Sequence, residues 1–133
     1  MIQLKKLILV FSLISLSAES NADWTLEATS GLLDLYVDFK DIVLDEEFVK
    51  SKRMTNYHKE QKSEMGMIYW SSISIVTYDC VKRLQQVERF RYTGQMGSGT
   101  RLENDFFKSD WEKVAAGTFN DNYMVRVCSG GDG

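Results

Sequence analysis

The chain has 133 residues, of which 16 are basic and 19 acidic, giving a net charge of −3 at pH 7. This length allows one modest domain. The acidic balance argues against a general nucleic-acid binder, because such proteins normally carry a strong basic excess. The sequence contains no internal repeat and no linker that would divide the domain.

Residues 1–22 have the layout of a secretory signal peptide. The basic pair Lys5 and Lys6 precedes an apolar stretch, residues 7–16, that is too short to span a bilayer. Small residues then occupy the cleavage-site positions in Ser-Asn-Ala, residues 20–22. The alternative is an uncleaved membrane anchor. We therefore expect an exported protein.

Processing would leave a single domain of modest size. It removes Lys5, Lys6 and Glu19, so that 111 residues with 14 basic and 18 acidic side chains remain. We expect residues 23–128 to form one domain and the glycine-rich residues 129–133 to form a flexible tail. No cysteine stands directly after the apolar stretch, so we expect no lipid anchor. The expected location is the periplasm, with display at the cell surface as the alternative.

Strand patterns dominate the first part of the exported chain. Apolar and polar residues alternate over residues 24–29 and 31–39, and more weakly over 47–57, whereas 67–80 and 84–94 are rich in β-branched and aromatic residues. Because the connections are short, neighbouring strands are expected to pair antiparallel. A tight bend is expected near residues 81–83.

The last segment has the pattern of a short helix. Thr118 is a suitable N-cap, and Asp121 three residues later suits the positive end of a helix dipole. Phe119, Tyr123 and Val127 then recur every four residues and form one apolar face. A closing strand is the alternative, because Tyr-Met-Val-Arg-Val also has strand character. The expected fold class is α+β: an antiparallel sheet with a short C-terminal helix.

Two cysteines, Cys80 and Cys128, lie in the exported part. An oxidising compartment favours a disulfide, and only one intramolecular pairing exists. Such a bridge would close a loop of roughly 49 residues and stabilise the fold by about 4 kcal/mol. A metal-binding pair and two free thiols are the alternatives. A single histidine, His58, cannot complete a convincing zinc set with them.

A basic stretch follows Cys80 and offers a candidate binding surface. Its members are Lys82, Arg83, Arg89 and Arg91. On an extended strand Arg89 and Arg91 share a face with Val87. They would bind an acidic protein partner. The alternative is a solvated sheet face on which the arginines pair with acidic residues near Asp79 or Glu88.

The sequence offers no catalytic or metal-binding motif. His58 stands alone without a nucleophile motif. The acidic residues of 38–47 lack the spacing of a calcium loop, and we interpret them as a turn with a soluble edge. The segment 94–101 lacks the lysine of a phosphate-binding loop, and its glycines at 94, 97 and 99 are expected to permit positive φ. We therefore expect no enzyme activity, no cofactor and no metal.

Several segments taken in order resemble the surface-adhesin protein E family of small exported Gram-negative proteins. They are LDLYVDFKDI, VKSKRMTNY, YDC with the basic stretch after it, RYTGQMGSG and SDWEKVAAGTFNDNYMVRVC. The resemblance covers most of residues 24–128. It implies an antiparallel sheet with a helix and a bridge between Cys80 and Cys128.

The resemblance also implies a function. The family takes its name from an adhesin that holds host extracellular-matrix proteins, which implies a noncatalytic module that binds host matrix or other proteins. The alternative is a soluble periplasmic accessory or inhibitor protein that binds a bacterial partner. We expect a protein partner, no nucleic acid and no membrane span. The oligomeric state stays open, with a homodimer among the options.

Overall fold

The computed structural model describes residues 23–103 and 106–130. The expected signal peptide, residues 1–22, and the last three residues of the expected tail lie outside this part. The strands in chain order are β1 (Thr25–Thr29), β2 (Leu33–Asp45), β3 (Phe48–Lys62), β4 (Ile68–Asp79), β5 (Leu84–Tyr92), β6 (Phe107–Lys108) and β7 (Glu112–Lys113). A 3₁₀ turn, η1 (Gln95–Gly97), follows β5, and helix α2 (Phe119–Cys128) ends the described chain.

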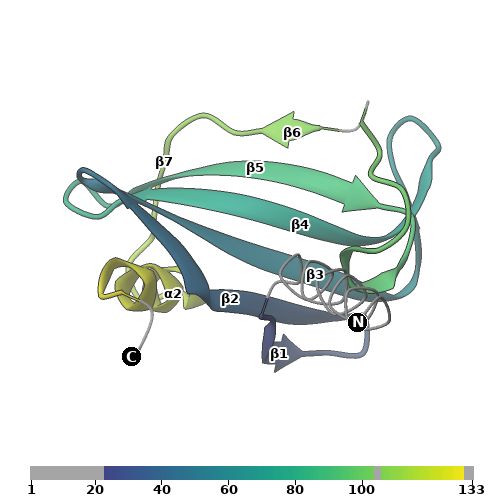
Figure 1. Cartoon of the computed structure of the whole chain (residues 1–133), viewed down its shortest axis with the longest axis horizontal. Helices are drawn as coiled ribbons and strands as arrows, with labels where there is room; N and C mark the ends of the chain where they lie inside the picture. Colours follow the sequence, from purple (N-terminus) through teal and green to yellow (C-terminus); the bar gives the residue numbers. More distant parts are fainter. Residues whose placement is uncertain (1–22, 104–105, 131–133) are drawn as a thin grey trace, which may run out of the picture.

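The strands form one antiparallel sheet in which neighbours in sequence are neighbours in space (Figure 1). The order is β1-β2-β3-β4-β5-β6. Strand β7 pairs with the first residues of β5, and β6 pairs with residues farther along the same strand. This confirms the expected antiparallel sheet with a C-terminal helix. The sequence did not predict β6 and β7, because two-residue strands carry no detectable alternation. Within the described residues, no helix is long and apolar enough to cross a bilayer.

The acidic segment 38–47 is mainly strand, so the expected turn over its whole length is wrong. Strand β2 continues to Asp45, with a break in its pairing to β3 between Asp38 and Val43. Asp38 is buried at this break, and its carboxylate accepts hydrogen bonds from the backbone N–H groups of Lys40 and Asp41. Only the tip beyond β2 is a turn, where Glu46 has a φ of 57°. Local capping by Asp38 therefore lets the strand resume.

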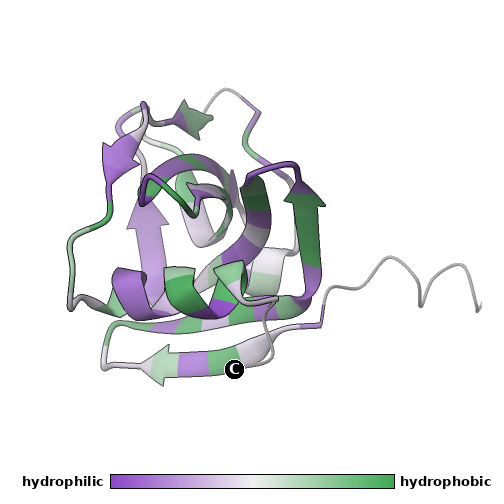
Figure 2. Cartoon of the chain, turned by 90° about the vertical axis from the view of Figure 1, so that its left-hand side faces the viewer, coloured by the Kyte–Doolittle hydropathy of each residue, from purple (hydrophilic) through white to green (hydrophobic). Residues whose placement is uncertain are grey.

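Helix α2 lies on the concave side of a strongly curved sheet (Figure 2). The ring of Tyr123 packs near Phe39 and Tyr78, at centroid distances of 5.9 and 6.0 Å. Its hydroxyl donates a hydrogen bond of 3.0 Å to Ser51 of β3. Residues of β3 that share the face of Ser51 therefore point toward the helix side, because side chains alternate along a strand.

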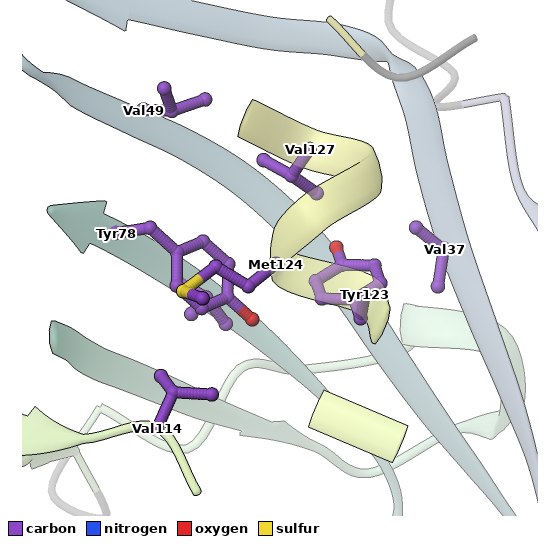
Figure 3. Packing of buried hydrophobic residues seen from close by; sticks show 8 residues of the cluster. Val37, Val49, Tyr78, Val114, Tyr123, Met124 and Val127 are labelled. Atoms are coloured by element: carbon purple, nitrogen blue, oxygen red, sulfur yellow. The ribbon is translucent and has the colours of Figure 1, made fainter. Parts of the chain in front are cut away.

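The hydrophobic core lies between α2 and the sheet (Figure 3). Met124 and Val127 of the helix are 2% and 0% exposed. They meet side chains from four other segments: Val37, Val49, Val76, Tyr78 and Val114. Burial of each large apolar side chain contributes about 1.5–3 kcal/mol. The helix is therefore held mainly by packing of Tyr123, Met124 and Val127, whereas Phe119, which the four-residue spacing placed on the same face, is 51% exposed.

The two ends of α2 are fixed as the sequence predicted. The hydroxyl of Thr118 accepts a hydrogen bond from the backbone N–H of Asp121, which confirms the N-cap. At the other end Cys128 forms a disulfide with Cys80 just beyond β4, with the Cα atoms 6.0 Å apart. The bridge is thereby confirmed, and the free-thiol and metal-pair alternatives are wrong. It ties the last turn of the helix to the β4–β5 turn.

The convex side of the sheet is partly covered by the segment around η1. The backbone N–H groups of Met96 and Gly97 donate hydrogen bonds to Asn56 and Ser71, on β3 and β4. Gly97 has a φ of 71°, and a Cβ there would lie 2.8 Å from Ile73. Positive φ was also correct for the glycine at 99 but wrong for the one at 94, whose φ is −105°. Only glycine therefore fits at position 97, because the backbone has a positive φ and because any Cβ would be too close to Ile73.

Candidate functional site

The four basic residues of the predicted binding stretch lie in two separate places. Lys82 and Arg83 belong to the β4–β5 turn, whereas Arg89 and Arg91 lie along β5. Lys82 is exposed. Arg83 donates a hydrogen bond to Asp121 at the start of α2. Arg83 therefore helps to attach the helix to the turn.

The electrostatics of Asp121 agree with this structural role. Its carboxylate accepts a hydrogen bond from the backbone N–H of Gly117, and this contact lowers the pKa of Asp121. The pairing with Arg83 lowers the same pKa further. Asp121 is thus held as a carboxylate at the helix start, where negative charge is favourable.

Arg89 and Arg91 lie on the helix-bearing side of the sheet, as their shared face with Val87 predicts. Val87 pairs with Val76 and packs against the core. Arg89 is paired with Ser74 and Arg91 with Ser72 on β4. They do not form the ion pairs expected near Asp79 or Glu88. Asp79 instead caps the β4–β5 turn, and Glu88 lies 3.7 Å from Lys108.

Arg91 has a well-defined environment. Its guanidinium carbon lies 4.6 Å from the centroid of the Tyr69 ring, within the range of a cation–π contact. It also lies 3.3 Å from a carboxylate oxygen of Glu64. The Arg91 side chain is only 10% exposed, whereas that of Glu64 is 84% exposed. Arg91 therefore contacts both an aromatic ring and a carboxylate.

Arg53 belongs to the same face, although the sequence did not single it out. It pairs with Ser74 across β3 and β4, and Ser74 pairs in turn with Arg89. The three residues therefore form one row across three strands. The guanidinium carbon of Arg53 lies 5.1 Å from the centroid of the Tyr123 ring. The alternation around Arg53 placed it on a strand face, but only the register places it opposite Arg89.

Arg89 is the least satisfied member of this row. Its guanidinium carbon lies 4.9 Å from the centroid of the Phe107 ring. Its Nε is buried and has no hydrogen-bond acceptor. Within the described residues, no carboxylate lies at ion-pair distance from Arg89 or from Arg53. Buried charged groups normally have partners, because an unpaired one costs several kcal/mol.

Tyr57 on β3 reports on the potential of this surface. Burial, with a smaller contribution from Tyr69, raises the pKa of the Tyr57 phenol. The positive charges of Arg89 and Arg91 act in the opposite direction on this pKa. The rings of Tyr57 and Tyr69 meet edge to face at 5.7 Å. The phenol stays protonated at neutral pH and keeps an O–H donor.

These side chains together form a surface that we call the concave basic face. Its members are Arg53, Tyr57, Tyr69, Ser72, Ser74, Arg89 and Arg91. All come from β3, β4 and β5, three adjacent strands of the sheet. Its partly exposed members are Arg53, Tyr57, Ser74 and Arg89, whereas Tyr69, Ser72 and Arg91 are buried beneath it. Such a surface suits the binding of an anionic group, with no general base among its members.

His58 takes part in a structural contact away from this face. Its Nδ1 lies 3.2 Å from the carbonyl oxygen of Gly31, and its Nε2 lies 3.1 Å from the carboxylate of Asp34. The hydroxyl of Thr29 donates to the same carboxylate, not to the imidazole. A nucleophile–base pair needs the hydroxyl on the imidazole. The contact instead joins the β1–β2 turn to β3.

A hollow of about 190 Å³ also lies between β2, β3 and β4. Its lining includes Asp41, Val43, Lys50 and Ile75. Asp41 is already paired with Lys52 at 3.0 Å. The volume is below that of typical ligand pockets, which begin near 300 Å³. Within the described residues, no group of three or more potential metal-ligating side chains lies close enough to hold a metal ion.

Comparisons with known proteins agree with the architecture. The chain resembles the structure of Haemophilus influenzae protein E with a TM-score of 0.60 and 17% identity, over 82% of this chain and 92% of that one. The selenomethionine form of that protein gives a TM-score of 0.59 and 16% identity, over 80% and 92% of the two chains. Protein E from non-typeable Haemophilus influenzae gives 0.59 and 16%, over 82% and 86%. No curated protein sequence gives a significant match.

Identity at this level shows the shared fold alone. The family model provides the further information, because it describes surface-adhesin protein E and matches residues 24–129, most of the chain. The match includes every described strand and α2. The chain therefore belongs to the surface-adhesin protein E family.

Proposed function

We propose that this protein is a noncatalytic exported module that binds an acidic surface of another protein through its concave basic face. Family membership supports an adhesin-like binding role. The observation that carries the proposal is that Arg53 and Arg89 are held on one sheet face without a carboxylate partner in the described part of the chain. Of the basic residues predicted from sequence, Arg89 and Arg91 belong to this face, whereas Lys82 and Arg83 lie in the β4–β5 turn.

The physical argument is that two ordered positive charges lack an acidic partner within the described residues. Arg53 and Arg89 are only partly exposed, and each lies over an aromatic ring that orders it. Ordering a long charged side chain costs conformational entropy. A partner carboxylate would offset this cost through charge-assisted hydrogen bonds, which contribute about 1.5–3 kcal/mol each. The aromatic contacts already restrict these arginine side chains, so binding a partner would cost them less conformational entropy.

Two kinds of protein partner fit this surface. One is a host protein, including extracellular matrix, reached from the cell surface. The other is a bacterial envelope protein, for which this chain would be a soluble periplasmic accessory or inhibitor. The cleavage pattern at residues 20–22, which would release the chain after export, favours the second location. Protease treatment of intact cells distinguishes them, since only the surface protein would be cut before the outer membrane is disrupted.

The binding role is tested by crosslinking capture with matched variants. The purified protein and Arg53→Gln/Arg89→Gln would be compared against immobilised host matrix proteins and against envelope extract. Lys59→Gln/Lys113→Gln is the control, because it removes the same charge from exposed positions. We expect the arginine variant to lose affinity, and the affinity of the unaltered protein to fall with salt. Equal affinity of the arginine and control variants would contradict the proposal.

A further inference from the structure

We propose that removal of residues 1–22 gives the protein an internal ion pair, between the new α-amino group of Asp23 and the carboxylate of Asp38. The inference rests on the export that the proposed function includes, and on cleavage after Ala22. It assigns the cleaved end of the chain a role in stabilising the fold. It is independent of the concave basic face and of any partner bound there.

Asp38 is a buried carboxylate that accepts hydrogen bonds from the backbone. The residue is 2% exposed. Its Oδ1 accepts hydrogen bonds from the N–H groups of Lys40 and Asp41, at 3.1 and 3.2 Å. Its Oδ2 accepts one from the backbone nitrogen of Asp23, at 3.3 Å. Because burial of a carboxylate is costly unless it is compensated, a positive charge at the Asp23 nitrogen would stabilise the folded chain.

The start of β1 is held against β2 beside this carboxylate. Thr25 pairs with Val37, so that the chain before β1 reaches the break in β2 that follows Asp38 (Figure 1). The carboxylate of Asp23 lies 2.6 Å from Nζ of Lys40, which belongs to the same stretch of β2. The strand pairing and the Lys40 contact together hold the Asp23 nitrogen near Asp38. The α-amino group therefore needs no rearrangement to reach its partner.

The charges around Asp38 leave room for one more cation. Lys52 lies opposite Asp38 in the register of β2 and β3, but its Nζ lies 3.0 Å from the carboxylate of Asp41. Lys40 contacts the carboxylate of Asp23. These three carboxylates and two lysines together carry a net charge of −1. An ammonium at the Asp23 nitrogen would neutralise the group.

Cleavage creates this charge at an atom that is already in place. In the uncleaved chain the Asp23 nitrogen is a neutral amide with one N–H. Hydrolysis of the bond between Ala22 and Asp23 by a signal peptidase consumes one water, whose oxygen goes to the carbonyl carbon of Ala22 and whose two hydrogens go to the nitrogen. Ala22 leaves as a carboxylate and Asp23 begins with an ammonium, since an α-amino group has a pKa of about 7.7–8.0. The hydrogen bond to Asp38 thereby becomes an ion pair.

Two purified chains that differ by one residue test this ion pair. One begins at Asp23 and the other keeps Ala22, and both contain the disulfide. In the longer chain the Asp23 nitrogen stays an amide, so the hydrogen bond is kept and only the charge moves away. We expect the chain that begins at Asp23 to melt about 2–6 °C higher at pH 6.5, as a partly buried ion pair would give in a domain of this size.

Variants then assign the effect to Asp38. In Asp38→Asn chains the difference between the two starts should fall below about 1 °C, because the side-chain amide still accepts an N–H but carries no charge. Asp41→Asn is the matched control. It removes a carboxylate from the same stretch of β2, one that pairs with Lys52, and should leave most of the difference.

A second measurement needs no variant of Asp38. The α-amino group of the folded chain that begins at Asp23 should react with an acylating reagent at pH 7 about threefold or more slowly than the same chain in urea, because an ion-paired ammonium provides less free amine. The folded chain that keeps Ala22 should react faster than the chain that begins at Asp23. Mass spectrometry of the N-terminal peptide measures both rates.

The outcomes separate the ion pair from the binding role. Equal melting temperatures of the two chains, or a difference that Asp38→Asn leaves intact, would overturn the ion pair. So would an α-amino group that reacts as fast in the folded chain as in urea. The exported protein should begin at Asp23 by mass spectrometry, and another first residue would overturn the link to processing. Failure to capture a partner, with these results intact, would defeat the proposed function alone.

Discussion

Removal of the bridge between Cys80 and Cys128 should reduce stability by a predictable amount. The two residues are 48 positions apart, so the bridge closes a loop of about 49 residues. The chain-entropy relation for a loop of this size gives about 4 kcal/mol at 25 °C. Domains of this size have unfolding free energies of about 5–15 kcal/mol. We therefore expect the Cys80→Ala/Cys128→Ala variant to fold, with a large part of its stability lost.

Urea denaturation of the oxidised protein and the double variant measures this loss. The variant should retain α2 on the sheet, because Tyr123, Met124 and Val127 remain buried. Its near-ultraviolet circular dichroism should therefore stay close to that of the unaltered protein. The dependence of unfolding free energy on urea should become steeper, since an unbridged unfolded chain exposes more surface.

Two results would refute this reasoning. A loss below about 1 kcal/mol would mean that the bridge does little to restrict the unfolded chain. Loss of the near-ultraviolet signal in the variant without denaturant would mean that the bridge, and not packing, holds α2. Reductant added to the double variant is the control and should change neither quantity.

Three further predictions concern packing, backbone and pH. Met124→Ala should lower the unfolding free energy by about 2–5 kcal/mol, whereas Val125→Ala, at a position 52% exposed, should change it by less than about 0.5 kcal/mol in the same urea titration. Gly97→Ala should cost about 1 kcal/mol or more, because φ is 71° and the new Cβ would meet Ile73; an unchanged melting temperature would contradict this. His58→Gln should destabilise the protein more at pH 5.5 than at pH 8, measured as the difference in melting temperature from the unaltered protein.

The sign of the pH effect follows from the contacts of His58. The hydrogen bond to Asp34, followed by that to the carbonyl of Gly31, raises the pKa of His58 above its usual 6.5. Its stabilising contribution is therefore complete below pH 6.5 and disappears as the pH rises through the raised value. The hydrogen bond from Thr29, followed by that with His58, lowers the pKa of Asp34 from 3.8, so its contribution disappears in acid. Equal effects of His58→Gln at both pH values would contradict this account.

The long elements could be predicted because their signals are local. The burial of Tyr123 and Val127 on α2 and the N-cap at Thr118 follow from local patterns, and so does the bend near residues 81–83, where Arg83 has a φ of 59°. The same spacing was wrong for Phe119, which is exposed. The extension of β2 past Asp38 could not be predicted, because it depends on that carboxylate capping two backbone N–H groups. Strand β6 depends on pairing with β5 at Glu88 and Arg89, a contact between distant segments.

The candidate site also combines features that local sequence patterns predict with features that depend on contacts between distant segments. Alternation placed Arg89 and Arg91 together on one strand face, and the register confirms that they share it. Arg53 lies about thirty-six positions earlier in the chain, and its place opposite Arg89 depends on the pairing of three strands. Lys82 and Arg83 lie close to Arg89 in sequence, but an extended strand moves them apart by about 3.3 Å per residue. Proximity in the chain was therefore a poor guide to proximity on the surface.

The attachment of α2 to the β4–β5 turn has a consequence for biogenesis. Asn120 accepts a hydrogen bond from Tyr78 and donates one to Gln85, and Arg83 binds the adjacent Asp121. These contacts position the start of the helix without sulfur chemistry. The segment that ends at Cys128 follows all seven strands in the chain. Because these contacts hold it beside the β4–β5 turn, they raise the effective concentration of the Cys128 thiol near Cys80, and oxidation seals an arrangement that noncovalent contacts already favour.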